Sequence, residues 1–159
     1  MKRWMAHMEE ATMKDYIMTK DQYGDWCMPP ESQELIHSKD PARKTDGAVL
    51  STTVYYDLLN KMIGFARICG QDADISGYES LAAKIKAAYN AKFFNKETAE
   101  YGNNTVTANI LSLRLGLVPE GYEGKVFSNI VKKTEEDFNG HVSTGVLGIQ
   151  HLMRGLTEY

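Results

Sequence analysis

The feature that most constrains this chain is its apolar periodicity, which follows the helical repeat almost from end to end. In residues 48–69 the apolar side chains recur at three- and four-residue steps: Leu50, Val54, Tyr55, Leu58, Leu59, Met62, Phe65, Ala66 and Cys69. Because an α-helix has about 3.6 residues per turn, this spacing places them on one face. No stretch alternates convincingly with the period of two that a half-buried strand requires. The pattern therefore predicts an all-α fold.

Six segments carry this periodicity and are predicted as helices: 1–19, 48–69, 73–94, 105–116, 121–138 and 144–159. Gly70 stands just past the end of one of them and Gly116 closes another, at positions where helices favour glycine. Ser76 and Glu79 have the spacing of a capping box. Long, feature-rich connections alternate with short ones. This alternation predicts antiparallel helical hairpins in part of a toroid, with the functional loops at one end.

The length and charge of the chain exclude several classes of protein. Its 159 residues are 43% apolar, so we treat 1–159 as one all-α segment with enough apolar side chains for a core. A net charge of −3 without a basic stripe argues against a nucleic-acid partner. The apolar runs are too short to cross a membrane. Cys27 and Cys69 lack metal-ligand spacing; we interpret them as free or buried thiols, and a disulfide between them stays open.

Both ends of the sequence resemble the interior of a helix. The first residues already follow an amphipathic pattern without a cap, and the last five, "GLTEY", stop while such a pattern continues. We expect the chain to be a segment of a longer protein. A targeting signal would then lie outside it, so the localisation stays unknown.

The long polar segment 20–46 contains Tyr23-Gly24-Asp25-Trp26. An indole face stacks on the apolar face of a sugar ring, and a carboxylate accepts hydrogen bonds from hydroxyls. These two side chains together therefore suit carbohydrate recognition. The residue types alone favour a structural interpretation instead, in which Trp26 fills an apolar gap and Asp25 caps a turn.

A second candidate segment is "NGHVSTG", residues 139–145. Its glycines permit a close approach of the backbone, and Ser143 or Thr144 is predicted to cap the last helix. His141 has the chemistry to donate a hydrogen bond to a ligand or to act as an acid or base. An ordinary loop histidine beside an ordinary helix cap explains the same residues.

Three further polar segments are predicted to be structural. Asn103-Asn104-Thr105 matches a glycosylation sequon, but its composition favours a turn and a helix start. Glu31 and Glu34 are carboxylates on one loop, a pairing that glycoside chemistry uses only at a suitable separation, and we expect them to be solvated. The charged run "KKTEED", residues 132–137, is predicted to be a solvated helix face.

Three segments, in this order, resemble the central part of the catalytic domain of bacterial α-L-rhamnosidases: "YGDWCMPP", "TANILSLRLGLVPEG" and "NGHVSTGVLGIQHLMRGLTEY". The resemblance covers nearly the whole chain. It implies the (α/α)6 toroid of six-hairpin glycosidases, of which this chain would form about half. It also implies inverting hydrolysis of terminal α-L-rhamnosyl bonds without a metal or organic cofactor. One carboxylic acid would protonate the leaving oxygen, and a second carboxylate would activate water.

The resemblance also implies which residues meet the substrate. Asp25 and Trp26 would line the sugar subsite, and His141 and Thr144 would lie on a loop at the same end of the toroid. The glycines at 24, 140 and 145 would serve as backbone positions. In the family, the general acid lies upstream in a motif of the type "DERxGWxGD", and the base lies downstream in one like "TxxWE". Neither motif occurs here, so no catalytic residue is assigned and the chain alone is expected to be inactive.

The expected partners are a rhamnoside substrate and the rest of the parent catalytic domain. Helix faces meant for missing neighbours would be exposed in the isolated segment, which favours self-association. Two alternatives stay open at this stage. One is another six-hairpin glycosidase or a related polysaccharide lyase. The other is a non-enzymatic helical domain, complete at this length, that binds carbohydrate or serves as a scaffold.

Overall fold

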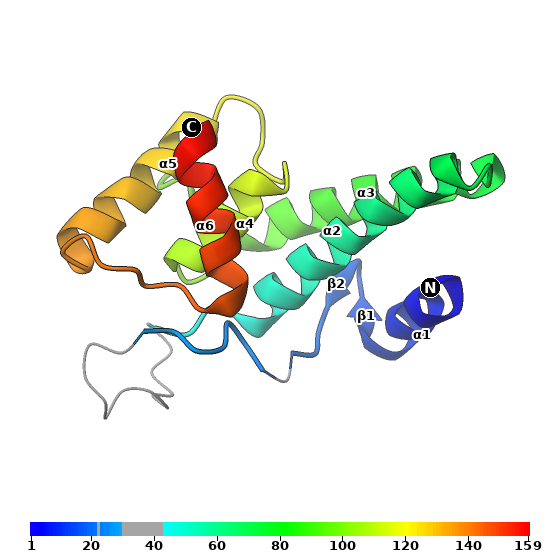
Figure 1. Cartoon of the computed structure of the whole chain (residues 1–159), viewed down its shortest axis with the longest axis horizontal. Coiled ribbons are helices and arrows are strands. Elements are labelled where there is room, and N and C mark those ends of the chain that lie inside the picture. Colours follow the sequence, from blue (N-terminus) through cyan, green and yellow to red (C-terminus); the bar gives the residue numbers. More distant parts are fainter. Residues whose placement is uncertain (22, 30–42) are drawn as a thin grey trace.

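A computed structural model describes residues 1–21, 23–29 and 43–159 (Figure 1). Its helices are α1 (Lys2–Thr12), α2 (Gly47–Ile68), α3 (Asp72–Phe93), α4 (Val106–Arg114), α5 (Glu123–Lys132) and α6 (Val146–Glu158). A π-helical turn, η2 (Lys133–Asp137), follows α5 directly. The all-α prediction is therefore confirmed. Glu31 and Glu34 lie outside the described residues, so their predicted solvation stays a prediction.

The two longest helices, α2 and α3, form a hairpin that extends to one side of the molecule (Figure 1). The Asp46 carboxylate starts α2 by accepting the N–H groups of Ala48 (2.7 Å) and Val49 (3.3 Å). Gly70, with φ +64°, ends it as predicted, because only the left-handed conformation lets the Gln71 N–H reach back to a helix carbonyl. Both helices begin and end one residue before the predicted bounds.

The capping box expected at Ser76 and Glu79 is not present. Helix α3 already begins at Asp72, and its N-cap residue, Gln71, makes no side-chain capping bond. Asp72 and Asp74 in the first turn place negative charge near the positive end of the helix dipole. Ser76 therefore lies inside the helix and is exposed.

Helix α4 is the central helix of the fold, because it contacts α2, α5 and α6. Every residue from Val106 to Leu113 is buried, which is typical of a helix surrounded by protein on all sides. Its buried polar side chains are hydrogen-bonded. The Ser112 hydroxyl, for example, shares a 2.7 Å bond with the Tyr89 hydroxyl, and burial raises the pKa of the Tyr89 phenol. The phenol therefore stays neutral.

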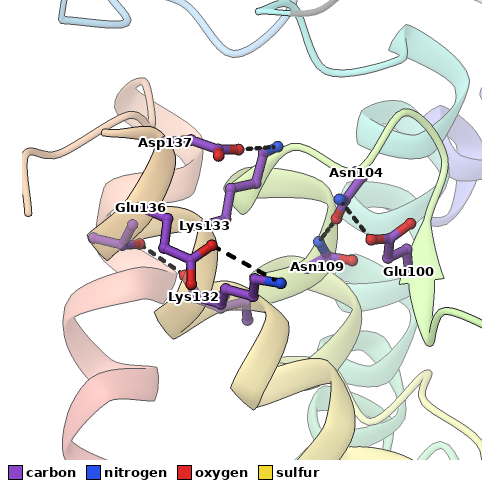
Figure 2. Close-up of polar contacts among 9 residues, drawn as sticks. Glu100, Asn104, Asn109, Lys132, Lys133, Glu136 and Asp137 are labelled. Atoms are coloured by element: carbon purple, nitrogen blue, oxygen red, sulfur yellow. Dashed lines mark hydrogen bonds and ion pairs between the residues drawn. The ribbon is translucent and has the colours of Figure 1, made fainter. Parts of the chain in front are cut away.

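A chain of amide hydrogen bonds fixes the start of α4 (Figure 2). Asn109 accepts the Tyr101 N–H (2.9 Å) and donates to Asn104 (2.7 Å), which donates in turn to the Glu100 carboxylate (2.8 Å). Asn104 has φ +56°, a conformation that asparagine tolerates better than most residues. The Thr105 hydroxyl then caps α4, so the predicted turn and helix start are confirmed.

Two small antiparallel hairpins contradict the prediction that the chain has no strand. They are formed by β1 (Met13–Lys14) with β2 (Ile17–Met18), and by β3 (Phe94–Asn95) with β4 (Glu100–Tyr101). The first shortens the helix predicted for 1–19, which ends at Thr12. Asp15 and Tyr16 have φ +50° and +62°, the conformation of a two-residue hairpin turn that usually needs Asn or Gly.

The predicted fifth helix is divided between α5 and η2. Its charged run is largely exposed and carries the ion pairs Lys132–Glu136 (3.9 Å) and Lys133–Asp137 (2.9 Å) (Figure 2). The solvated face is thus confirmed, although its last turn is π-helical. Exposed ion pairs of this kind contribute little stability. No helix in the described ranges is both long enough and apolar enough to cross a membrane.

Candidate functional site

The loop of residues 23–29 and the loop of residues 139–145 meet at the end of the molecule where α6 begins (Figure 1). The Val146 N–H donates to the Trp26 carbonyl at 2.8 Å. The structure therefore brings together the two candidate segments, which lie about 120 residues apart in the sequence.

The Asp25 carboxylate lies at the centre of this contact and is 5% exposed. Its Oδ2 accepts the Thr107 hydroxyl (2.5 Å) and the Gly145 N–H (2.7 Å). Its Oδ1 accepts the N–H groups of Leu147 (3.0 Å) and Gly148 (3.1 Å). We call this carboxylate and its four donors the Asp25 clamp. A carboxylate offers about four acceptor positions, so the protein itself fills them all.

The Asp25 clamp corrects one expectation and bears on a second. The capping role predicted for Ser143 or Thr144 belongs to Asp25, because the N-cap residue of α6 is Gly145 and makes no side-chain capping bond. A carboxylate at this end also has favourable electrostatics with the helix dipole. The carboxylate oxygens that would accept bonds from a sugar hydroxyl already accept bonds within the protein, which argues against the direct sugar contact predicted for Asp25.

Two glycines leave room for the clamp, Gly145 at the N-cap of α6 and Gly148 in its first turn. A Cβ at Gly145 would lie 2.4 Å from the carbonyl oxygens of both Asp25 and Trp26. A Cβ at Gly148 would lie 2.5 Å from the Thr107 hydroxyl. Gly145 therefore permits the close approach of two backbone segments that the sequence predicted. Gly24 (φ +68°) and Gly140 (φ +77°) instead adopt the left-handed conformation that favours glycine, and nothing lies within 4 Å of a Cβ at Gly140.

The Trp26 side chain is 67% exposed and therefore does not fill an apolar gap in the core. It lines an apolar groove of 410 Å³ together with Trp4, Tyr23, Val54 and Leu147. An exposed indole in such a groove is free to stack on a ligand. Its contact with a sugar stays a prediction.

His141 is exposed and lines a second cavity, of 600 Å³, beside Arg43, Lys133 and Ser143. Ser143 and Thr144 are 6% and 2% exposed, and within the described ranges neither hydroxyl has a hydrogen-bond partner. The structure thus separates the four predicted residues. Trp26 lines the groove, His141 lines the cavity, and Asp25 and Thr144 are buried.

Sequence reasoning missed two residues of this region, Thr107 and Trp4. Thr107 carried no local signal, because a threonine in an apolar helix is ordinary and its partner, Asp25, is 82 residues away. Trp4 lies in the segment 1–19, for which the sequence predicts only a helix, yet it lines the same groove as Trp26. Periodicity alone does not predict which aromatic side chains of a helix stay exposed.

The described part of the chain holds no cluster of three or more His, Cys, Asp or Glu side chains that could bind a metal ion. Cys27 and Cys69 are both exposed and free, so the possible disulfide between them is absent.

Comparison with known proteins identifies relatives for the whole chain. The sequence profile of the bacterial alpha-L-rhamnosidase 6 hairpin glycosidase domain matches residues 1–159. Two curated alpha-L-rhamnosidases of Formosa agariphila share 26% identity over 159 residues and 28% over 148 residues. These alignments cover 99% and 88% of this chain, but only 16% and 15% of the relatives. The chain thus spans about a sixth of the length of the curated proteins it matches.

Solved structures agree. The alpha-L-rhamnosidase from Dictyoglumus thermophilum superposes with a TM-score of 0.86 at 29% identity, over 99% of this chain and 17% of that one. The Streptomyces avermitilis alpha-L-rhamnosidase, solved with L-rhamnose, gives 0.83 at 23% identity, over 99% and 14%, and supports the fold alone. The all-α hairpin architecture is therefore that of the six-hairpin glycosidases. Because the family profile covers every residue, the chain belongs to the bacterial α-L-rhamnosidase six-hairpin glycosidase domain family.

Proposed function

We propose that this chain forms part of the catalytic domain of a glycoside hydrolase that releases terminal α-L-rhamnose with inversion at the anomeric carbon. The observation that carries the proposal is the family match over residues 1–159. It favours a rhamnosidase over a scaffold or a different six-hairpin enzyme. The chain covers only 16% of a curated relative, so we propose the activity for the parent enzyme of which this chain is a part.

The chain supplies one wall of the sugar site in this proposal. The Trp26 indole stacks on the apolar face of the rhamnose ring, which its 67% exposure permits. His141, exposed on the neighbouring loop, donates a hydrogen bond to a hydroxyl. The Thr144 hydroxyl, on the same loop as His141, is buried and has no hydrogen-bond partner among the described residues, so its sugar contact also stays a prediction. Asp25 acts only through the protein.

The acid and the base come from outside these 159 residues. Inversion needs one carboxylic acid and one carboxylate, about 6.5–9.5 Å apart with space for a water between them. The sequence contains neither of the two acidic motifs that the family resemblance implies. No metal or organic cofactor enters the proposed reaction, because the two carboxylates supply the proton transfer.

A chimera tests the proposed activity. This chain would replace its structural counterpart in the Dictyoglumus thermophilum enzyme, which superposes with a TM-score of 0.86. We expect the folded chimera to hydrolyse an aryl α-L-rhamnoside and to release β-L-rhamnose first, as followed by proton NMR. A folded chimera without turnover would contradict the proposal. Release of the α-anomer first would contradict inversion, and turnover by the isolated chain would contradict an external acid and base.

The sugar wall has its own test in the same chimera. Trp26→Ala should raise KM about tenfold, because stacking on a sugar contributes on the order of 1–2 kcal/mol. Phe65→Ala is the matched control, since Phe65 is an exposed aromatic residue of α2 (48%) that lies outside the groove lining. Equal KM values for the two variants would remove Trp26 from the site.

A further inference from the structure

We propose that Asp25 and Thr107 are positioning residues, which hold the Trp26 indole at the rim of the apolar groove by fixing its backbone to α4 and α6. The inference rests on the proposed function only in assigning the sugar contact to Trp26. It gives the acidic residue of the "GDW" segment a role in orienting its neighbour rather than in touching the ligand.

Trp26 needs such support because its side chain gains little from packing. With two thirds of its surface exposed, the indole is not fixed by neighbours in the way that a core residue is. Its orientation therefore depends on the backbone. The carbonyl of Trp26 accepts a hydrogen bond from the Val146 N–H (2.8 Å). The residue before it, Asp25, is held through its side chain by the Asp25 clamp.

The two residues that flank Asp25-Trp26 in the sequence show that this backbone is constrained. Gly24 and Cys27 both have positive φ angles, +68° and +58°. For a residue with a Cβ, the left-handed conformation costs about 1–2 kcal/mol. Cys27 keeps it only because surrounding interactions outweigh that cost. The Asp25 clamp is the set of interactions in the right place to do so.

Thr107 is the part of the clamp that a substitution can remove cleanly. The other three donors are backbone N–H groups at the N-cap and in the first turn of α6, which remain when Thr107 is substituted. Thr107 comes from α4, the central buried helix, so its hydroxyl fixes the loop to the most buried element. Thr107→Val keeps the shape of the side chain and leaves one carboxylate position without a donor, whereas Thr107→Ser keeps the hydroxyl.

Fluorescence can report on Trp26 alone. The chain has two tryptophans, so a Trp4→Phe background leaves Trp26 as the single indole. In this background we expect Thr107→Val to raise the amplitude of nanosecond indole motion at least twofold, measured by time-resolved anisotropy. L-rhamnose should bind about tenfold more weakly, measured by titration of the same emission. Thr107→Ser should stay within twofold of the parent in both measurements.

Thr53→Val is the matched control. Thr53 is also fully buried, but its hydroxyl donates to the Leu50 carbonyl within its own helix (2.9 Å). It should lower the unfolding midpoint in urea without changing Trp26 motion. If Thr107→Val does not fold, Asp25→Asn provides the second variant. It should raise Trp26 motion and speed hydrogen exchange at the Val146 amide, which donates to Trp26.

The outcomes separate the two proposals. Equal Trp26 motion in the Thr107→Val and Thr53→Val variants would overturn the positioning role, and so would a Thr107→Ser variant as mobile as Thr107→Val. If Trp26 becomes mobile while the parent chain binds no L-rhamnose, the positioning role stands and the sugar wall is contradicted. Rhamnose binding that survives a mobile Trp26 would overturn the link between positioning and affinity.

Discussion

Gly145 shows at the scale of one residue how little space the clamp leaves. A methyl group there would meet two backbone carbonyl oxygens at 2.4 Å, and neither atom can move without moving the loop. We expect Gly145→Ala to lower the free energy of unfolding by at least about 2 kcal/mol, measured in urea. Gly64→Ala is the control, because nothing lies within 4 Å of its Cβ position in α2. It should gain up to about 1 kcal/mol of helix propensity, and similar losses in both variants would contradict the contact.

His151 on α6 predicts a pH dependence of stability. Burial lowers its pKa, the Asp57 carboxylate opposes this, and Arg114, Arg154 and Lys61 lower it further. The imidazole is therefore neutral in the folded chain at a pH where the unfolded chain, with a pKa near 6.5, already binds a proton. The free energy of unfolding should fall as the pH drops through 6.5.

Urea titrations between pH 7.5 and pH 5 test the sign of this effect. His151→Gln should reduce the loss of stability over that range, because glutamine takes up no proton. His7→Gln, which removes a histidine from an exposed position of α1, serves as the control. A parent chain that gains stability on acidification, with His151→Gln removing the gain, would contradict the prediction.

Asp25 and Trp26 show which site properties a sequence carries. The sequence indicated that the two side chains suit carbohydrate recognition, and it also left open that Trp26 fills an apolar gap. The exposure of Trp26 excludes the gap-filling interpretation, and exposure depends on the rest of the fold. Asp25 caps a helix about 120 residues away, and no local sequence pattern predicts such a long-range cap. Local rules gave that role to Ser143 or Thr144, which are adjacent to the helix.

At the scale of elements, the predicted boundaries are accurate where the signal is local. Gly70 and Gly116 end their helices because a glycine with positive φ completes the final turn. The first helix is too long in the prediction, because its apolar spacing continues through Asp15 and Tyr16. Tertiary contacts bend the chain there into a hairpin: the Met18 N–H, for instance, donates to the Thr52 hydroxyl of α2 at 3.0 Å.

The observed cap of α2 and the predicted capping box of α3 can be compared in one test. Asp46→Ala removes a carboxylate that accepts two N–H groups of α2, so it should lower the free energy of unfolding by about 1 kcal/mol. Ser76→Ala removes the expected capping-box residue, which lies exposed inside α3, and should change stability by less than about 0.5 kcal/mol. Urea unfolding measures both. A larger loss for Ser76→Ala would restore the capping box.

At the scale of the whole molecule, the helical period predicted the fold class, and the order of three short motifs predicted the family. The distribution of burial was not predictable in the same way. The sequence of α4 contains three polar residues, Thr107, Asn109 and Ser112, which periodicity alone would place on an exposed face. In the structure α4 is buried on every side, while Met5 is the buried residue of α1. The number of neighbours around a helix is a property of the assembled fold.

This difference predicts that the molecule opens unevenly. Amides of α1 should exchange with deuterium through local opening, because that helix has no side-chain cap and little buried surface. Amides of α4 should exchange only when the whole chain unfolds. Ile110→Ala, at a fully buried α4 position, should cost about 2–5 kcal/mol and reduce protection in every helix that shares this core.

Met5→Ala removes an equally buried side chain, 2% exposed, from the outlying helix. Its effect on hydrogen exchange should be confined to α1 and the hairpin of β1 and β2, which follows it directly. Mass spectrometry of peptic fragments resolves the two patterns. Loss of protection in α4 upon Met5→Ala would mean that α1 unfolds together with the core. The uneven opening would then be wrong, because α1 would share one cooperative unit with the central helix.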